Sequence, residues 1–445
     1  MKKSIDYPRV LIVYNSRINT FDQHGVSIRG WFADWPKENL AQIYSGIENE
    51  EASFSSSNFQ LGIKERRFGK YFFKLKKSSF GQSSYSVSLD DKSKNINKYN
   101  FLSLLKTKIS GWLVNTGLWE LIFSPKLSKE MIKFVEDFNP QIIYCQGYSL
   151  TFAWLPVMIH NKTRTPICFQ TGDDWPSHLY KNSIISILVR PIVNKAVKTL
   201  ISKSVLRLAN GKLMSDVFNE RYGVSFGINM MCDNIKRFQN ANIYQVVDKS
   251  SISIVYSGNL GSGRWMSIID LCEAVEMLDN EGLNISVVAF ASTIPPEGVN
   301  ELLKYSNLQI LPNPSHDDLP SYLKGADILF LPETFDSNQA ESVRLSISSK
   351  AHLYMLSEKP ILVYGSSING IVSYAEEGGW ACIVKEKSRI KLSQSILQLI
   401  NDSVYRNILI EKGKIVAQRN HDSILIRSNF EELMQSVISS NAKSL

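Results

Sequence analysis

The feature that most constrains the fold is the alternation of short apolar runs with longer amphipathic stretches along the chain. Runs that are apolar almost throughout, with no alternating polar residues, are typical of parallel strands covered by helices on both faces of a sheet. The pattern therefore predicts a layered α/β fold. In the first half, the predicted strands are 9–14, 40–44, 141–145 and 166–170.

The same alternation starts again after a polar stretch at residues 237–251. Two such halves, each of about 200 residues, predict two doubly wound domains that face each other across a cleft. The second half has predicted strands at 252–256, 284–290, 308–311, 328–331, 360–364 and 381–384, and predicted helices at 266–280, 319–325, 349–357 and 422–436.

We expect an N-terminal domain at 1–236, a C-terminal domain at 237–421, and a final helix in 422–445 that packs back on the N-terminal domain. Residues 50–130 interrupt the pattern of the first half. Serine, lysine and aromatic residues dominate much of this segment and its apolar periodicity is weak. We expect an insertion there, part of it loop.

The composition excludes several classes of protein. Of the 445 residues, 44% are hydrophobic and 21% are charged, which argues against disordered and fibrous chains. No run approaches the ~18–20 apolar residues that span a bilayer, and no cleavage site follows the first apolar run. The cysteines are odd in number and form no CxxC pair, which argues against a disulfide framework or a zinc site and favours the reducing cytoplasm. They are Cys145, Cys168, Cys232, Cys272 and Cys382.

The charges are divided unevenly between the halves. Residues 1–250 hold 34 Lys and Arg against 20 Asp and Glu (+14), whereas residues 251–445 hold 16 against 22 (−6). Residues 62–77 and 181–212 each hold seven basic residues, interleaved with aromatic or aliphatic side chains. Such stretches are typical of contact with an anionic membrane. The alternative is that residues 184–206 form core helices with solvated lysines.

The most specific local motif is IVYSGNLGSGRW at 254–265. An apolar strand leads directly into Gly258, Asn259, Gly261 and Gly263, and an amphipathic helix follows. Glycines let the backbone approach a ligand, helix-start amides can hold a phosphate, and Arg264 adds donors that suit diphosphate oxygens. The spacing is neither the dinucleotide fingerprint nor a Walker loop, so an ordinary tight turn is the alternative.

Three segments of the second half occur in the order seen in GT-B glycosyltransferases. They are the turn at 257–263, LPSYLKGADILFLP at 319–332 and SSKAHLYMLSEKPILVYGS at 348–366. The chain resembles this family over nearly its whole length apart from roughly 50–130, and most resembles the retaining, family-4-type enzymes of bacterial polysaccharide synthesis. The first half agrees at HGVSIRGWF (24–32), WPKENLAQIY (35–44), FQTGDDWP (169–176) and ERYGVSF (220–226).

The resemblance implies a fold of two Rossmann-like domains and a glycosyltransferase of hexosyltransferase type. It would move a sugar from a nucleotide-sugar donor to a glycan or lipid-linked acceptor in cell-surface polysaccharide synthesis. Retention would follow a front-face route, in which the departing phosphate helps deprotonate the acceptor hydroxyl. Cations and helix amides would stabilise the leaving diphosphate, so neither a metal nor a cofactor is expected. The expected location is the cytoplasm, at the inner face of the plasma membrane, with the basic half on the lipid.

The resemblance also assigns donor-binding residues. Gly258, Asn259, Gly261 and Arg264 match the phosphate-facing turn. Ser349 and Lys350 match a Ser-Lys pair that opens a later helix, where hydroxyl, ammonium and helix amides can converge on phosphate. Without the resemblance, Lys350 is better explained as a solvated helix residue.

One departure from the family concerns a pair of glutamates eight positions apart. Glu333 and Glu341 have that spacing, yet alignment through Lys359-Pro360 puts Leu353 at the ribose-facing position. Both registers cannot hold. For the helix we follow the alignment through Lys359-Pro360. We keep Glu341 as a donor-binding candidate; the alternative is that it is an exposed glutamate in a loop.

In the N-terminal domain, His24 and Gly25 match the loop that approaches the donor phosphate and the acceptor. Asp173 and Asp174 follow a predicted strand end, where α/β folds place active groups. His24, Asp173 and Asp174 are therefore catalytic candidates, and Gly25 is a donor-binding candidate. The alternatives are a structural histidine and helix capping by the aspartates ahead of Trp-Pro.

Two other functions stay open. The missing second glutamate allows a catalytically inactive GT-B homologue that serves as a partner subunit. The basic first half allows a nucleic-acid-binding protein, although no RNP, zinc-finger or helix-turn-helix signature supports it. Binding of a nucleotide-sugar would exclude a nucleic-acid-binding protein. Transfer or hydrolysis of the sugar would then distinguish an enzyme from an inactive subunit.

Overall fold

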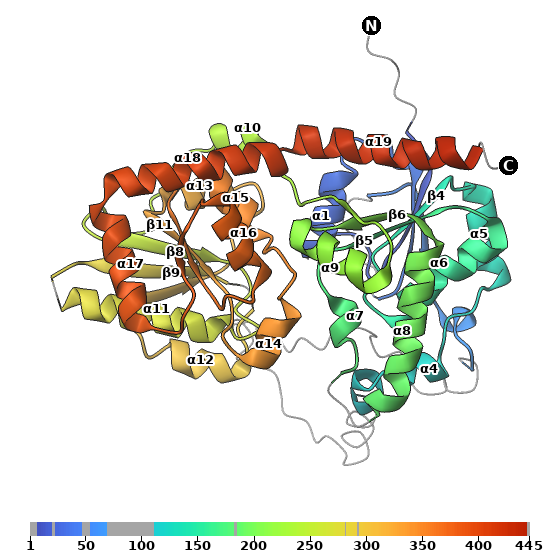
Figure 1. Ribbon diagram of the computed structural model, residues 1–445, viewed down its shortest axis with the longest axis horizontal. Coiled ribbons are helices and arrows are strands. Elements are labelled where there is room, and N and C mark those ends of the chain that lie inside the picture. Colours follow the sequence, from blue (N-terminus) through green and yellow to red (C-terminus); the bar gives the residue numbers. More distant parts are fainter. Residues whose placement is uncertain are drawn as a thin grey trace, which may run out of the picture. The chain divides into compact units, whose positions relative to one another are not determined.

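The computed structural model describes residues 7–19, 23–46, 54–68, 111–181, 185–280, 282–291 and 293–442 (Figure 1). The chain forms two compact units, each built on one parallel sheet. Among the described residues, unit 1 holds those up to Met230 together with the chain from Arg427 onward, and unit 2 holds Met231–Ile426. Of the predicted insertion at 50–130, residues 50–53 and 69–110 lie outside the described residues.

Unit 1 contains a seven-stranded parallel sheet in the order β3-β2-β1-β4-β5-β6-β7. The four strands predicted in the first half correspond to β1, β2, β4 and β5, and the other three were not predicted. The strands are β1 (Val10–Val13), β2 (Leu40–Tyr44), β3 (Ser57–Gln60), β4 (Ile142–Cys145), β5 (Ile167–Thr171), β6 (Ser204–Ala209) and β7 (Gly227–Ile228).

Helices cover the sheet of unit 1, with α6 against β1, β4 and β5 and α8 against β5 and β6 (Figure 1). On α8, Val189, Val193 and Leu200 are buried. This helix therefore contributes to the core, as expected from the alternative in which residues 184–206 form core helices. The described helices are α1 (Gln23–Trp31), α4 (Leu118–Ile122), α5 (Lys129–Phe138), α6 (Leu150–Thr163), α7 (Trp175–His178), α8 (Ser186–Lys203) and α9 (Lys212–Tyr222), with 3-10 turns η1 (Lys37–Asn39) and η2 (Ile63–Glu65).

Unit 2 contains a six-stranded parallel sheet in the order β10-β9-β8-β11-β12-β13. All six strands predicted in the second half are present, with ends within one residue of those expected. They are β8 (Ile252–Ser257), β9 (Ile285–Phe290), β10 (Leu308–Leu311), β11 (Ile328–Pro332), β12 (Ile361–Tyr364) and β13 (Cys382–Val384).

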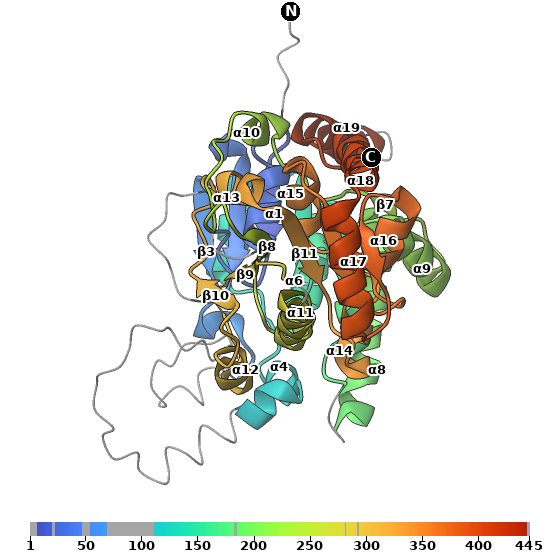
Figure 2. The same cartoon turned by 90° about the vertical axis from the view of Figure 1, so that its left-hand side faces the viewer.

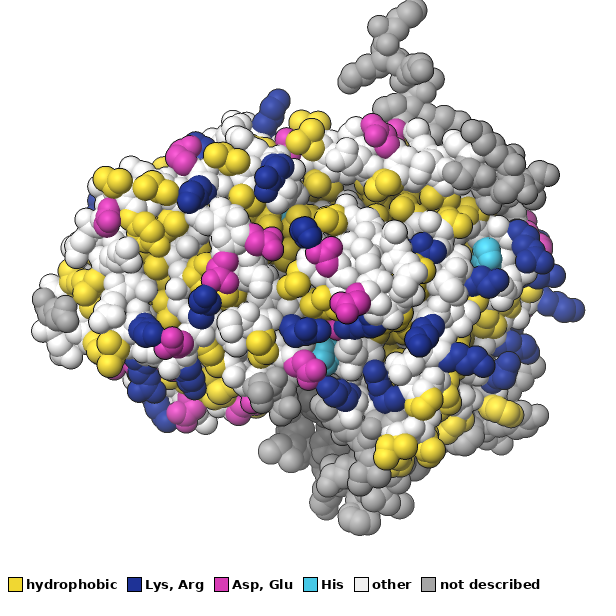
Figure 3. Space-filling model, viewed as in Figure 1, with side chains coloured by type: hydrophobic (Ala, Val, Ile, Leu, Met, Phe, Trp, Pro, Cys, Tyr) yellow, Lys and Arg dark blue, Asp and Glu magenta, His cyan; other side chains and the backbone are white. Residues whose placement is uncertain are grey.

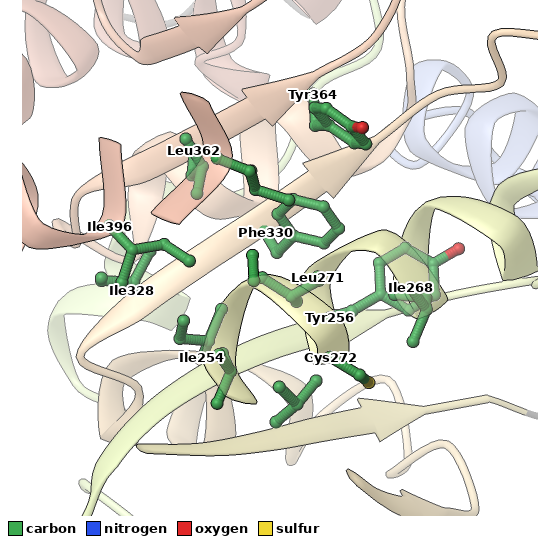
Figure 4. Packing of buried hydrophobic residues seen from close by; sticks show 14 of the residues in the cluster. Ile254, Tyr256, Ile268, Leu271, Cys272, Ile328, Phe330, Leu362, Tyr364 and Ile396 are labelled. Atoms are coloured by element: carbon green, nitrogen blue, oxygen red, sulfur yellow. The ribbon is translucent and has the colours of Figure 1, made fainter. Parts of the chain in front are cut away.

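The strands of unit 2 bury alternate side chains in two separate cores. Ile254, Tyr256 and Phe330 point to α11 (Arg264–Asp279), where Ile268 and Leu271 meet them (Figure 4). The intervening residues of the same strands pack on the opposite side against α13 (Leu319–Gly325) and α15 (Lys350–Leu356), and Figure 2 shows these helices and α11 on opposite sides of β8 and β9. The other helices are α10 (Ile235–Gln239), α12 (Pro296–Leu302), α14 (Ser337–Ser342), α16 (Gly370–Gly378), α17 (Arg389–Asn401) and α18 (Ser403–Asn420).

The last helix, α19 (Ser423–Ala442), starts in unit 2 and belongs to unit 1 from Arg427 onward. Phe430 is fully buried and packs edge-to-face on Phe32 and Tyr144, with ring centroids 5.1 and 6.2 Å apart. Arg427 Nε donates to the carbonyl oxygen of Gly30 at 2.7 Å. The end of the described chain therefore completes the core of unit 1.

The two places where the chain passes between the units are joined by hydrogen bonds inside unit 2. The Asp233 amide donates to the His421 carbonyl at 3.1 Å, and the Ser423 amide donates to the Asp233 carbonyl at 3.0 Å. His421 Nδ1 lies 2.6 Å from the Met231 carbonyl oxygen, and burial lowers the pKa of His421 to about 4. A neutral His421 with its proton on Nδ1 therefore donates this hydrogen bond.

We predict that Phe430→Ala destabilises unit 1 by about 3–5 kcal/mol, because it removes a buried ring and leaves a cavity against Phe32 and Tyr144. Urea denaturation followed by tryptophan fluorescence measures the change. Ile424→Ala on the same helix is the control, since Ile424 is exposed and should change little. Equal stability of the two variants would contradict the docking of α19.

Candidate functional site

The best-defined candidate site lies in unit 2, where the strand order reverses between β8 and β11. Doubly wound sheets bind ligands at this point, outside the carboxyl ends of the strands. Gly258 follows β8 directly and Glu333 follows β11 directly. Arg264 and Lys350 open α11 and α15, and together with these residues they form the cluster that we call the β8–β11 cluster: Gly258, Arg264, Glu333 and Lys350.

The turn after β8 requires glycine at its first position. Gly258 has φ of +147°, and a Cβ there would overlap Cε of Lys350 and lie 2.8 Å from its Nζ. Asn259 holds the turn through both of its oxygens, since its carbonyl accepts from Tyr256 Oη at 2.6 Å and its Oδ1 accepts from the Gly261 amide at 2.5 Å. The turn thus brings backbone and ammonium into close contact.

Arg264 and Glu333 form an ion pair within the cluster. Arg264 Nη2 lies 2.9 Å from Oε2 and 3.1 Å from Oε1 of Glu333, and the side chains are 16% and 4% exposed. The main chain of Glu333 is fixed as well, because its amide donates to Tyr364 and its carbonyl accepts from Ser267 Oγ. Arg264 Nε is buried and has no hydrogen-bond partner among the described residues, so one donor is available to a ligand.

Lys350 is only 6% exposed although it opens a helix, so it is not the solvated residue that the sequence alone suggested. Nζ lies 5.6 Å from the ring centroid of Tyr256. In the described part of the chain, Nζ makes neither a hydrogen bond nor an ion pair. Burial lowers the pKa of Lys350 to about 7; the charge of Arg264 adds to this effect and that of Glu333 opposes it.

The β8–β11 cluster therefore holds two cationic side chains against one carboxylate, with donors that lack partners. A buried cation without a hydrogen bond is costly, and an anionic ligand removes that cost. The arrangement suits an anion with several oxygens, such as a diphosphate.

The other donor-binding candidates of unit 2 differ in their surroundings. Ser349 directly precedes Lys350, is partly buried and makes no capping hydrogen bond. Glu341 lies on α14 with its side chain exposed. Leu353 is partly buried and packs against the second core of unit 2. The roles of Ser349 and Glu341 stay predictions.

In unit 1, the carboxylate of Asp174 is occupied by Arg221. Nη1 and Nη2 of Arg221 lie 2.5 and 2.8 Å from the two carboxylate oxygens, and Nη1 also donates to Ser177 Oγ at 3.0 Å. This hydrogen-bonded pair raises the pKa of Arg221. Asp174 precedes α7 but makes no side-chain capping bond, so the capping alternative is wrong for it. Its surroundings favour a structural tie between α7 and α9 over catalysis.

The remaining candidates of unit 1 lie on other elements. Asp173 follows β5, is partly buried, and adds to burial in raising the pKa of Tyr148. Gly25 is buried in α1. His24 lies in the first turn of α1, and its side chain is outside the described part of the structure. The catalytic roles of His24 and Asp173 stay predictions.

Three residues of the site were not predicted from the sequence: Glu333, Tyr256 and Tyr354. Tyr256 carries the ring beside Lys350, and the Tyr354 hydroxyl accepts from the Ser257 amide at 2.9 Å. Glu333 follows the predicted strand 328–331 almost directly, so the rule that selected Asp173 also points to it. No comparable signal marks the two tyrosines, which look like ordinary core residues in the sequence.

No group of three or more His, Cys, Asp or Glu side chains in the described part of the chain is arranged to hold a metal ion. Metal-independent chemistry stays a prediction.

The fold of this chain is that of GT-B glycosyltransferases. No known protein-family profile matches the sequence, and no curated protein is recognisably similar to it. Solved structures, in contrast, match it over nearly its whole length.

One match is Anabaena HepE in complex with UDP and glucose, with 11% identity, 97% of this chain and 100% of that chain covered, and a TM-score of 0.60. A second is α,α-trehalose 6-phosphate synthase from Burkholderia multivorans, with 10% identity, coverages of 98% and 100%, and a TM-score of 0.62. A third is a glycosyltransferase from Rickettsia africae, with 13% identity, coverages of 97% and 99%, and a TM-score of 0.57. At these identities the likeness establishes the fold.

We predict that Asp174→Ala lowers the stability of unit 1 by about 2–3 kcal/mol, because it orphans the half-buried guanidinium of Arg221. Asp216→Ala on α9 is the matched control. It removes an exposed ion pair with Lys212 and should cost less than about 1 kcal/mol. Both are measured by urea denaturation. A fully stable but inactive Asp174→Ala would instead support the catalytic assignment.

Proposed function

We propose that the protein is a glycosyltransferase that takes a sugar from a nucleotide-sugar donor, with the diphosphate bound at the β8–β11 cluster. The observation that carries this proposal is the buried side chain of Lys350, whose Nζ has neither a hydrogen bond nor a counter-ion in the described structure, beside the unpaired Nε of Arg264. Both groups lie at the switch point of the sheet. The neighbours in complex with UDP, with UDP-glucose, or with UDP and glucose support a nucleotide-sugar as the ligand.

In this proposal the cluster acts on the leaving group. Cleavage of the glycosidic bond leaves negative charge on the diphosphate, and the fixed cations of Lys350 and Arg264 stabilise that charge. Glu333 holds the guanidinium of Arg264 in place, so no reorganisation is needed as charge develops. Two cationic groups can stabilise this charge without a metal ion, which supports a metal-independent route. Retention and a glycan or lipid-linked acceptor in cell-surface polysaccharide synthesis complete the proposal, on the family resemblance.

We predict that a nucleotide-sugar raises the melting temperature of the protein in a screen of UDP-, GDP- and other activated sugars. Arg264→Ala and Lys350→Ala should each weaken this binding at least tenfold, since each removes a charged donor from a buried anion. Lys385→Ala is the matched control, because Lys385 pairs with Glu376 at the surface of the same unit. Unchanged affinity in both cluster variants would refute the site.

The same screen leads to a test of activity. With the selected donor, release of the nucleoside diphosphate shows transfer or hydrolysis, and NMR of the product anomer shows retention or inversion. Binding without turnover would favour the inactive partner subunit. Absence of binding to any activated sugar would exclude both the active glycosyltransferase and the inactive subunit that binds a nucleotide-sugar.

We further propose that unit 1 contacts an anionic membrane through α8, on the cytoplasmic side. Ile187 and Leu188 are 76% and 72% exposed near the start of α8, and Lys195 and Lys198 are exposed further along it. Figure 3 shows Lys and Arg side chains gathered on this unit above an apolar group at the end of α8. Apolar side chains below a basic band suit insertion among anionic headgroups, at about 1 kcal/mol per basic residue.

A cavity of about 480 Å³ lies along the same helix, and it is lined by Trp154, Pro191, Ile192, Lys195, Ala196 and Thr199. Of the other predicted basic segment, residues 69–77 lie outside the described residues. In the described part of the chain, no helix is both long enough and apolar enough to cross a bilayer.

We predict that the protein co-sediments with vesicles that contain anionic lipid and less with neutral vesicles. The double variant Ile187→Asp, Leu188→Asp should lose most of this binding, because it removes two exposed apolar anchors and adds negative charge. Ile415→Asp is the control, because Ile415 lies in unit 2 and is also exposed, at 61%. Failure of wild-type protein to bind at any salt concentration would contradict the membrane contact.

A further inference from the structure

The β8–β11 cluster has an unbalanced set of charges. Arg264 and Lys350 are the cations, and Glu333 is the one carboxylate that lies among them in the described structure. Both oxygens of Glu333 lie within 3.1 Å of Arg264 Nη2, so its charge is directed to the guanidinium. Lys350 is the more deeply buried of the two cations and has no counter-ion of its own.

The surroundings of Lys350 on each neighbouring element explain why its charged form is disfavoured. From β8 it faces the ring of Tyr256, whose hydroxyl donates to Asn259. From α11 it faces the cation Arg264, and after β11 the already paired Glu333. On its own helix, the Tyr354 hydroxyl is occupied by the Ser257 amide. An ammonium here loses most of its water and gains only a ring face, which offsets part of that loss.

We propose that binding of a nucleotide-sugar at the β8–β11 cluster is coupled to uptake of one proton by Nζ of Lys350. This inference rests on the proposed function, since it takes the diphosphate of the donor as the anion. The neutral amine accepts a proton from solvent and becomes an ammonium, and no other bond forms or breaks. The two phosphates supply both the counter-charge and the acceptor oxygens that the empty cluster lacks.

The direction of the pH effect follows from linkage. In the free protein the pKa of Lys350 is about 7, and a diphosphate beside it raises that value. Below pH ~7 the amine is already charged, so binding of the donor takes up few protons. Above pH ~7 uptake approaches one proton, and affinity falls about tenfold for each pH unit until the raised pKa is reached. The donor is therefore held more weakly in alkaline solution.

Titration calorimetry of the full chain with UDP-glucose and with GDP-mannose tests the coupling. Their phosphates are esterified and carry no proton in the range used, whereas the terminal phosphate of free UDP would titrate near pH ~6. Measurements in HEPES and in Tris, which differ in ionisation enthalpy, give the protons taken up. With a pKa of about 7, we expect close to zero at about pH 6, about 0.5 at about pH 7 and about 0.9 at about pH 8.

Two variants assign the proton to Lys350. Lys350→Arg keeps a cation that cannot be neutralised, so any binding that it retains should show no uptake and no loss of affinity between about pH 6 and pH 8. Lys350→Met has no titrating group and should bind more weakly, again without uptake. Lys304→Met is the control, because Lys304 pairs with Glu301 at the surface, and it should behave as wild type.

The outcomes separate this inference from the proposed function. Binding of either sugar by wild-type protein with no uptake at about pH 8 overturns the inference and leaves the donor site standing. Undiminished uptake in folded Lys350→Met, checked by its thermal unfolding, also overturns it, because another group then takes the proton. Failure of these two sugars and of every other activated sugar in the screen to bind overturns the donor site, and the inference with it.

Discussion

Coverage of both faces of each sheet determines where chemistry can occur in this protein. In β8, Ile254 and Tyr256 are buried on one face and Val255 on the other, and the buried Ser253 hydroxyl is taken up by Asp327, so the strand itself presents no free polar group to a ligand. The same holds for β11 and β12. Functional groups are left to the strand ends, and the reversal of strand order makes a place where two loops diverge. Gly258 and Glu333 lie at that place because β8 and β11 end there.

The charge at the β8–β11 cluster is a local property. Residues 251–445 have an excess of acidic side chains, and yet the cluster inside this region is cationic. The distant acidic groups are screened by salt over about 8–10 Å, whereas buried neighbours act at short range through a medium of low polarity. The overall charge of a domain therefore says little about the ligand that its binding site selects. A basic first half is equally compatible with an acceptor side or a lipid surface, and α8 is where its apolar and basic groups combine.

Much of the fold could be predicted because buried parallel strands are written as nearly continuous apolar runs. The strands of unit 2 other than β10 had this signature, and so did β1, β2, β4 and β5. The edge strand β10 (LQIL) is partly exposed and was predicted from its three apolar residues. The missed strands lacked it. β3 is a polar, partly exposed edge strand, β7 has two residues, and β6 follows α8 without a turn and exposes Val205. Their structure depends on pairing with neighbours, which no local pattern records.

The candidate site was less accessible to prediction, since its character depends on burial and on partners distant in sequence. Spacing placed Lys350 at the start of a helix but could not show that the turn after β8 encloses its ammonium. Nothing local connects Arg264 with Glu333, which are 69 positions apart. Asp174 shows the same dependence on distant partners: its place at a strand end marked it as a catalytic candidate, but nothing local in the sequence shows that Arg221 on α9 pairs with its carboxylate.

The docking of α19 has a consequence for how the protein is made. Phe32 and Tyr144 are synthesised early, and Phe430, which covers them, is synthesised after all of unit 2. Domains generally fold as units while the chain emerges from the ribosome. Here unit 1 emerges first, but its aromatic surface stays uncovered until α19 is synthesised. Unit 2 can therefore finish folding before unit 1. The unit that is synthesised first is thus the last to complete its core. A nascent chain arrested before α19 would expose an aromatic, aggregation-prone surface that is buried in the finished protein.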